Sequence, residues 1–171
     1  TCALPICYSS RASGPYSSLL GGYNLTASGN YSSVVGGEGN IASCHHAFVG
    51  GGVYNCATYY RAAVLGGQNN CATNWFSVVG AGQYNTANGY AAGTVSGRYN
   101  RACNDDSFVG GGYVNHADGL QSAVVGGIAN CTTGACSFVG GGSCNVASGT
   151  YSTVTGGWNN QATGTRSTVT G

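Results

Sequence analysis

The chain has 171 residues, of which 32 are glycine and only 5% are charged, and its formal net charge is +1. The cationic side chains are five scattered arginines, which do not form the basic patch that nucleic-acid binding requires. No apolar run approaches the ~18 residues of a membrane-spanning helix, so membrane insertion is excluded. The 42% hydrophobic content is too high for a disordered tail.

A repeat of 15 residues extends along almost the whole chain, with the pattern A-S-G-x-x-S-x-V-x-G-G-x-x-N-x. Four positions of the repeat keep one residue type, with single exceptions at Thr94 and Thr132: glycine (Gly22 to Gly157), asparagine (Asn40 to Asn160), an aliphatic residue (Leu19 to Val169) and alanine (Ala12 to Ala162). A unit this short is typical of one coil of a β-solenoid.

Residues 1–8 lack the glycine pair, so we expect them to form a degenerate first coil or cap before a single β-solenoid domain at residues 9–171. Residue types that recur in each repeat are spaced by two positions, which indicates short strands around Val34 and around Ala42 in one coil. Gly36-Gly37 marks one turn, and the second turn is expected near Gly29-Asn30. The fold class is therefore all-β, a narrow parallel β-solenoid of about eleven coils. Coils at ~4.8 Å spacing make a rod of roughly 50 Å.

Small side chains are predicted to fill the interior, in columns of serine or alanine, valine, asparagine and alanine. Asparagines stacked at a turn can form hydrogen bonds along the stack, which would satisfy their buried amides. The outward positions of the valine strand are also apolar. In seven successive coils a large residue accompanies a small one, and the order alternates: Phe48/Gly50, Ala63/Leu65, Val78/Gly80, Gly93/Val95, Phe108/Gly110, Ala123/Val125 and Phe138/Gly140.

A strand that is apolar on both sides is usually buried on both sides, so this outer face predicts an interface between copies of the chain. The predicted self-association residues are Phe48, Leu65, Val78, Val95, Phe108, Val125 and Phe138. In the alternative interpretation, each phenylalanine folds over the glycine of a neighbouring coil in the same chain. The other strand is irregular and polar on its outward side and is expected to face solvent. Tyrosines gather at the turns, where they can either contact a surface or glycan or pack the turn.

Nine cysteines in so short a chain indicate an oxidising compartment, and the odd number leaves at least one free or paired between chains. Cys56 and Cys71 share a column in adjacent coils, about 4.8 Å apart, which makes them the disulfide candidates. The remaining cysteines could equally serve as small apolar fillers.

Three glycosylation sequons begin at Asn24, Asn30 and Asn130. Asn24 and Asn30 lie at turns and are candidate acceptors, whereas Asn130 belongs to the inward asparagine column and is expected to be unmodified. The three histidines and four carboxylates do not recur with the repeat and form no nucleophile–base–acid set, so we expect neither an enzyme nor a cofactor. Cys44-His45-His46 is not expected to bind a metal, because adjacent side chains point apart.

The unit S-x-V-x-G-G-x-x-N-x-A-S-G-x-x, as it stands from Ser32 onwards and again from Ser152, resembles the head repeats of YadA-like trimeric autotransporter adhesins. It also resembles repeats of phage and viral fibres, and the resemblance covers the chain from about Ser9 to Gly171. It implies a left-handed parallel β-roll that forms a homotrimer laterally and contacts a matrix or host surface. It implies no catalytic residues.

A second resemblance is to grass-type ice-binding β-rolls. Ice binding needs a regular outer array of threonines, which only Thr153, Thr155, Thr168 and Thr170 supply here. The sequence thus favours an extracellular structural or adhesive fibre protein, at a cell or virion surface, that joins copies of itself as a trimer or filament. The alternative is a monomeric ice-binding or carbohydrate-binding β-roll.

Overall fold

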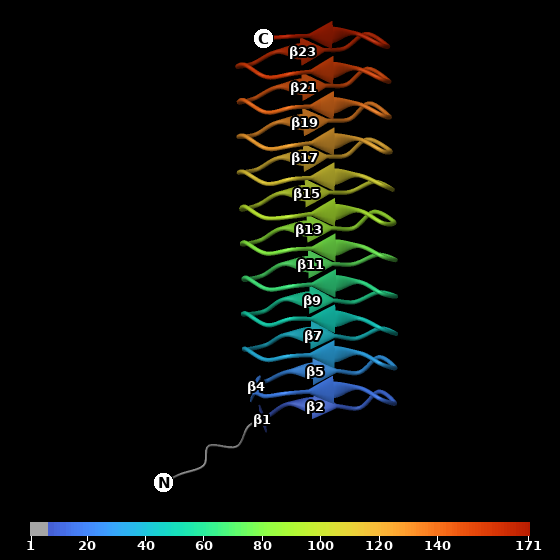
Figure 1. Ribbon diagram of the computed structural model, residues 1–171, viewed down its shortest axis with the longest axis vertical. Coiled ribbons are helices and arrows are strands. Elements are labelled where there is room, and N and C mark those ends of the chain that lie inside the picture. Colours follow the sequence, from blue (N-terminus) through green and yellow to red (C-terminus); the bar gives the residue numbers. More distant parts are fainter. Residues whose placement is uncertain (1–6) are drawn as a thin grey trace.

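Residues fifteen positions apart lie directly beside one another in the computed structural model, which describes residues 7–171 (Figure 1). Their strands pair in parallel, and the Cα atoms of Cys56 and Cys71, which occupy the same position in adjacent coils, are 4.8 Å apart. Each coil contributes two strands of two residues to two facing sheets. The prediction of a parallel β-solenoid of about eleven coils is confirmed, and residues 1–6 of the expected cap lie outside the described part of the chain.

The first sheet, here called the valine sheet, has eleven parallel strands whose second residue points inward. In chain order these are β3 (Ser18–Leu19), β6 (Ser33–Val34), β8 (Phe48–Val49), β10 (Ala63–Val64), β12 (Val78–Val79), β14 (Gly93–Thr94), β16 (Phe108–Val109), β18 (Ala123–Val124), β20 (Phe138–Val139), β22 (Thr153–Val154) and β24 (Thr168–Val169).

The second sheet, here called the alanine sheet, also has eleven parallel strands. These are β2 (Arg11–Ala12), β5 (Thr26–Ala27), β7 (Ile41–Ala42), β9 (Cys56–Ala57), β11 (Cys71–Ala72), β13 (Thr86–Ala87), β15 (Arg101–Ala102), β17 (His116–Ala117), β19 (Cys131–Thr132), β21 (Val146–Ala147) and β23 (Gln161–Ala162).

A third row of backbone pairing, which the sequence did not predict, follows the glycine turn that joins each valine strand to the next alanine strand. Strand β1 (Cys7–Tyr8) pairs with β4 (Gly22–Tyr23), and single-residue parallel bridges continue from Tyr23–Glu38 to Ser143–Trp158. The turn is therefore hydrogen-bonded from coil to coil like the sheets on either side of it.

The interior is as narrow as the sequence predicts. The valine and alanine columns are fully buried over most of the rod, and the asparagine column is buried from Asn40 to Asn145. Small side chains allow the two sheets to approach closely, so each coil encloses only a few side-chain atoms between its two strands. Stability in such a rod comes from the contacts of each coil with its neighbours.

The asparagine side chains form a continuous ladder of hydrogen bonds. Asn70 accepts the backbone N–H of Asn85 at 2.9 Å through Oδ1, and its Nδ2 donates to the carbonyl oxygens of Gly66 at 2.9 Å and Gly82 at 2.8 Å. The same three bonds recur at each asparagine from Asn40 to Asn145. Every side-chain amide therefore connects its own turn to the next coil.

The two exceptions in the repeat are compensated locally. Thr94, which replaces a valine, donates through Oγ1 to the carbonyl oxygen of Thr86 at 3.1 Å. Thr132, which replaces an alanine, donates to Ser122 Oγ at 2.9 Å. Both buried hydroxyls thus have partners, so the core tolerates them.

Glycine is required at the second position of the glycine turn for two reasons. Gly37 has a φ of 92°, and a Cβ there would lie 2.7 Å from Asn40 Nδ2 and would collide with the backbone of Gly52. The approach of the asparagine amide and the left-handed backbone both exclude a larger residue.

The second turn lies near Gly29-Asn30, as predicted, and its left-handed residue is Tyr31, with a φ of 58°. Gly29 is needed because a Cβ there would collide with the backbone of Cys44. Among the non-glycine residues with positive φ in residues 7–171, Val114 is the one with a β-branched side chain.

Replacing one asparagine of the ladder should destabilise the rod strongly. Asn70→Ala removes three hydrogen bonds. It leaves the Gly66 carbonyl and the Asn85 N–H without partners, whereas the Gly82 carbonyl keeps the N–H of Gln68, and the free energy of unfolding should fall by about 3 kcal/mol. Urea unfolding followed by circular dichroism measures the change. Asn160→Ala is the control, because Nδ2 of Asn160 donates to the Gly156 carbonyl only. Equal midpoints for the two variants would contradict the role of the ladder.

Candidate functional site

The outer surface of the valine sheet carries a stripe of exposed apolar side chains. All seven predicted self-association residues point outward, and their exposure runs from half-buried Phe48 and 37% for Phe138 to 58% for Leu65. The face defined by Phe48, Leu65, Val78, Val95, Phe108, Val125 and Phe138 is here called the apolar face.

The phenylalanines also pack within their own chain. A Cβ placed on Gly93 would lie 3.5 Å from Cδ2 of Phe108, and one placed on Gly110 would lie 3.5 Å from Cε1 of the same ring. The ring therefore lies against both glycines. Its contact with Gly93, in the neighbouring coil, is the one that the alternative interpretation expected. Phe108 nevertheless remains 41% exposed, so this contact covers only part of the ring.

The outward-facing glycines beside the apolar face occur in two different environments. A Cβ on Gly80 or Gly110 would collide with the carbonyl oxygen of Val95 or Val125 in the next coil, so the backbone itself requires these glycines. Gly93, in contrast, meets only the ring of Phe108 at ordinary contact distance. The alternation of large and small residues on this surface is therefore set partly by the close approach of the backbone of adjacent coils.

A hollow of about 280 Å³ lies in the middle of the apolar face, above Gly80 and Gly93. Its rim is formed by Leu65, Val95 and Phe108, which are exposed. The hollow can accept an apolar side chain from a partner, since its lining offers such a side chain only apolar contacts apart from Thr94.

The apolar face ends at two coils with threonines, as predicted. Thr155 Oγ1 donates to the carbonyl oxygen of Thr170 at 2.9 Å, and Thr153 and Thr168 lie beside one another in paired strands. The four threonines thus form an outward-facing array that is two coils long.

The outer surface of the alanine sheet carries the predicted disulfide, between Cys56 in β9 and Cys71 in β11. It closes a loop of one coil, for which chain-entropy estimates give about 3 kcal/mol of stabilisation. Cys44, Cys103, Cys131, Cys136 and Cys144 are free thiols. A disulfide in this position is typical of a protein from an oxidising environment.

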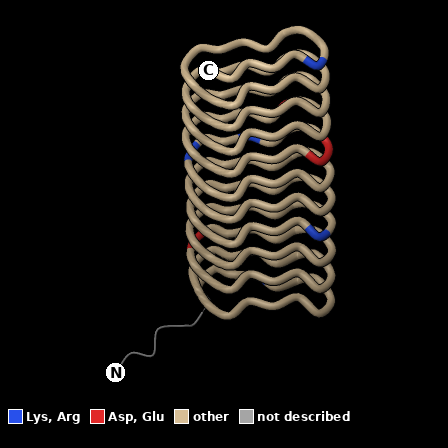
Figure 2. Tube along the Cα trace, turned by 45° about the horizontal axis from the view of Figure 1, so that its top comes forward, with Lys and Arg blue, Asp and Glu red and all other residues tan. Residues whose placement is uncertain are grey.

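Charged side chains are few and scattered along the rod (Figure 2). Arg101 in β15 and Asp118 in the next coil form an ion pair at 2.9 Å. The hydrogen bond to Asp118 raises the pKa of Arg101. Burial, assisted by a hydrogen bond to Asp118, raises the pKa of the Cys103 thiol to about 11. Burial likewise raises the pKa of Cys131, so both thiols are held in the unreactive protonated form.

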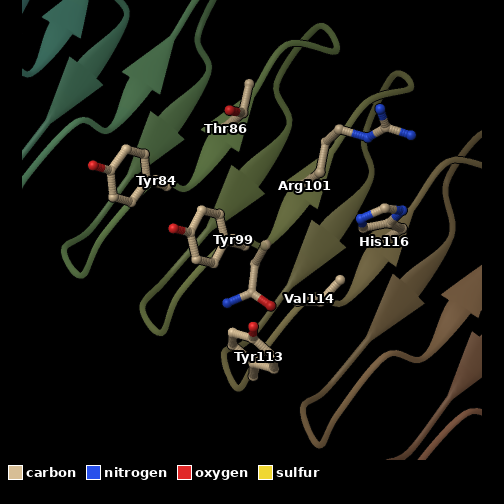
Figure 3. A pocket seen from close by; sticks show the side chains of 8 residues that line it. Tyr84, Thr86, Tyr99, Arg101, Tyr113, Val114 and His116 are labelled. Carbon is tan, nitrogen blue, oxygen red and sulfur yellow. The ribbon is translucent and has the colours of Figure 1, made fainter.

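A groove of about 520 Å³ lies between the glycine turns and the outer surface of the alanine sheet (Figure 3). Tyr84, Tyr99, Tyr113 and Val114 line it from the turns, and Thr86, Asn100, Arg101 and His116 line it from the adjacent strand segments of β13, β15 and β17. The sequence analysis noted the tyrosines and missed the groove, because its lining comes from two separate columns over three coils. The sequence did contain an indication of the groove. Tyr84 and Tyr99 are fifteen residues apart, which places them in adjacent coils, and Arg101 follows Tyr99 by two residues.

Aromatic rings stack along the second turn over several coils. Tyr31 lies between Tyr16 and His46, with ring centroids 4.8 Å and 5.0 Å apart, and the series continues through Tyr60 and Trp75. Parallel stacking at the coil spacing shows that these rings help to hold successive turns together.

The candidate glycosylation sites differ in accessibility. Asn24 is exposed in a turn, with a φ of 53°, whereas Asn30 is half-buried and its carbonyl oxygen accepts the His46 N–H at 2.9 Å. Asn130 is buried in the asparagine ladder. Of the three sequons, Asn24 thus presents the most accessible acceptor.

Within residues 7–171 no group of three or more histidine, cysteine, aspartate or glutamate side chains could hold a metal ion. The same part of the chain has no helix long and apolar enough to cross a membrane. No protein-family model and no curated protein sequence matches the chain.

The elevated pKa of Cys103 has a direct chemical consequence. At pH 8 iodoacetamide should label Cys103 far more slowly than the exposed Cys144, because only the thiolate reacts. Between pH 8 and 10 the rate at Cys103 should rise about tenfold per pH unit, because the thiolate fraction grows in that proportion below the pKa. Peptide mass spectrometry after timed labelling measures both rates. A rate at Cys103 that is already constant above pH 8 would contradict the assignment.

Proposed function

We propose that this protein is a rod-shaped structural element of an extracellular fibre at a cell or virion surface, and that it associates laterally with copies of itself through the apolar face. The observation that supports this most is the valine sheet itself. It is a parallel sheet whose inner side is fully buried from Val34 to Val154, and whose outer side carries leucine, valine and phenylalanine over seven coils, all of them exposed except the half-buried Phe48. Parallel sheets are ordinarily covered on both sides.

A second copy of this chain fits the apolar face better than a globular partner. The large residues alternate between two columns, so their pattern repeats every two coils. A partner must present side chains at the same spacing over the same length, and another copy of the solenoid does so. An exposed apolar patch of this kind generally marks an interaction surface.

The alternation also favours one orientation. When two copies face each other about an axis parallel to the rod, the first outward column of one copy lies opposite the second outward column of the other. In register, Val78 then faces Gly80 of the other copy, and Val95 faces its Gly93. Both valines can enter the hollow at the centre of the face. The same pairing of columns applies to a parallel trimer and to a parallel bundle.

In this arrangement the alanine sheet and the turns remain on the outside of the assembly. The exposed tyrosines at the turns, such as Tyr16, Tyr31 and Tyr151, are then available to contact a host surface or matrix. Stiffness along the fibre comes from the backbone pairing and the asparagine ladder, which continue without interruption from coil to coil.

A charge in the middle of the apolar face should dissociate the assembly. Phe108→Asp places a carboxylate where the second copy would cover it, and desolvating an unpaired charge is costly. We expect this variant to elute as a 17.0 kDa monomer in size-exclusion chromatography with light scattering. Trp158→Asp is the control, because Trp158 is 75% exposed on a glycine turn. Unchanged association of both variants, with normal circular dichroism, would argue against this interface.

Cross-linking tests the parallel orientation. A chain with Gly93→Cys is mixed with a chain carrying Val95→Cys and treated with a short bismaleimide, since facing sheets lie about 10 Å apart. We expect a 93–95 link between chains in peptide mass spectra. Val125→Cys is the matched control for Val95→Cys, because it lies in the same column two coils away. A 93–125 link without a 93–95 link would contradict the register.

A further inference from the structure

The groove between the glycine turns and the alanine sheet has the features of a ligand site that is independent of the apolar face. It is lined by three tyrosines together with Thr86, Arg101 and His116, whereas the hollow on the apolar face has an apolar lining (Figure 3). We infer that this groove binds an acidic saccharide, with its sugar rings against the tyrosines and its acidic group at Arg101.

The aromatic side of the groove offers exposed ring surface and phenolic hydroxyls to a sugar. Tyr84 and Tyr99 are nearly parallel, with centroids 4.9 Å apart and planes 10° apart, and Tyr113 meets Tyr99 edge-on at 6.1 Å. All three rings are between 41% and 45% exposed. Their hydroxyls make no hydrogen bond within residues 7–171, so they are free to bond a ligand's hydroxyl groups.

The charge in and beside the groove favours an anion. Arg101 lines the groove, and Arg98, which does not line it, lies in the same coil beside two of its tyrosines. The Arg98 guanidinium lies 5.0 Å from the Tyr113 ring centroid and 5.9 Å from that of Tyr99. The nearby carboxylate, Asp118, is already paired with Nη2 of Arg101. One arginine charge therefore remains uncompensated.

The ion pair with Asp118 also prepares Arg101 for a second partner. It holds the guanidinium at 2.9 Å through one terminal nitrogen and leaves the donors on the other nitrogens without protein partners in the described residues. A planar guanidinium can donate two parallel bonds to a carboxylate or sulfate. The side chain of Arg101 is 47% exposed, so a ligand can reach it.

The shape of the groove favours a chain of sugars over an enclosed small molecule. Its lining residues extend over three successive coils, and Tyr84, Tyr99 and Tyr113 follow one another along the rod axis (Figure 3). An extended saccharide can lie along this axis, with one ring near each tyrosine. A nucleic acid is a poorer fit, because the net charge of +1 and the scattered arginines offer no continuous basic stripe.

Binding of tetragalacturonate, measured by isothermal titration calorimetry, tests the inference, with maltotetraose as the neutral control. We expect the acidic tetramer to bind and the neutral one to bind at least about tenfold more weakly, the difference that one charge-assisted hydrogen bond supplies. Equal affinity for the two saccharides, or no detectable binding of tetragalacturonate, would overturn the proposal.

Variants assign the binding to this groove. Arg101→Gln combined with Asp118→Asn removes both charges of the ion pair together, and Tyr99→Ala removes the central ring. Each should weaken tetragalacturonate binding about tenfold or more. Arg61→Gln is the matched control, because Arg61 also lies over aromatic rings, those of Tyr60 and Phe76, but at the second turn. A loss with Arg61→Gln as large as that with Tyr99→Ala would place the binding elsewhere.

Saccharide binding in the groove and self-association through the apolar face can be tested separately. Phe108→Asp lies on the opposite sheet and should leave tetragalacturonate binding unchanged while it dissociates the assembly. Loss of binding in this variant would mean that the groove requires the assembled fibre, which contradicts a site formed by a single chain.

Discussion

The hydrogen bonds of the buried asparagines are the constraint on which the rest of the rod depends. Each amide bonds its own glycine turn and two points of the next coil, so the turn has one permitted shape and one permitted register. The glycine of the turn must be left-handed and without a side chain to let the amide approach, as at Gly37. Because this arrangement recurs in each coil from Asn40 to Asn145, side chains of one column are stacked at the same spacing along this part of the rod.

That regular stacking determines where function can reside. The interior of the described residues is filled by buried valine, alanine, serine and asparagine side chains, so interactions with other molecules use the outer surface. The two sheets offer opposite chemistry. The valine sheet presents leucine, valine and phenylalanine in a straight stripe, whereas the alanine sheet presents the disulfide, the Arg101–Asp118 ion pair and free thiols. The proposed fibre subunit, which pairs through one sheet and contacts its surroundings with the other side, accounts for both.

The fold was predictable because a fixed period of 15 residues places each column without ambiguity. The inward valine, alanine and asparagine columns, the outward phenylalanines and the Cys56–Cys71 disulfide all follow from the period and the alternation of strand side chains. Backbone conformation was not predictable in the same way. Tyr31 and Val114 adopt a left-handed φ that their side chains disfavour, because the stacked turn imposes it. The groove beside Tyr99 was missed because it depends on how far turn side chains project over neighbouring strands, which a repeat pattern does not specify.

Sedimentation velocity of the unaltered protein over a range of concentrations, with negative-stain images of the same samples, tests most directly whether the apolar face joins copies of the chain. The account predicts species heavier than 17.0 kDa that grow with concentration and appear as side-by-side rods or filaments. A single monomeric species at every concentration, imaged as isolated short rods, would contradict it.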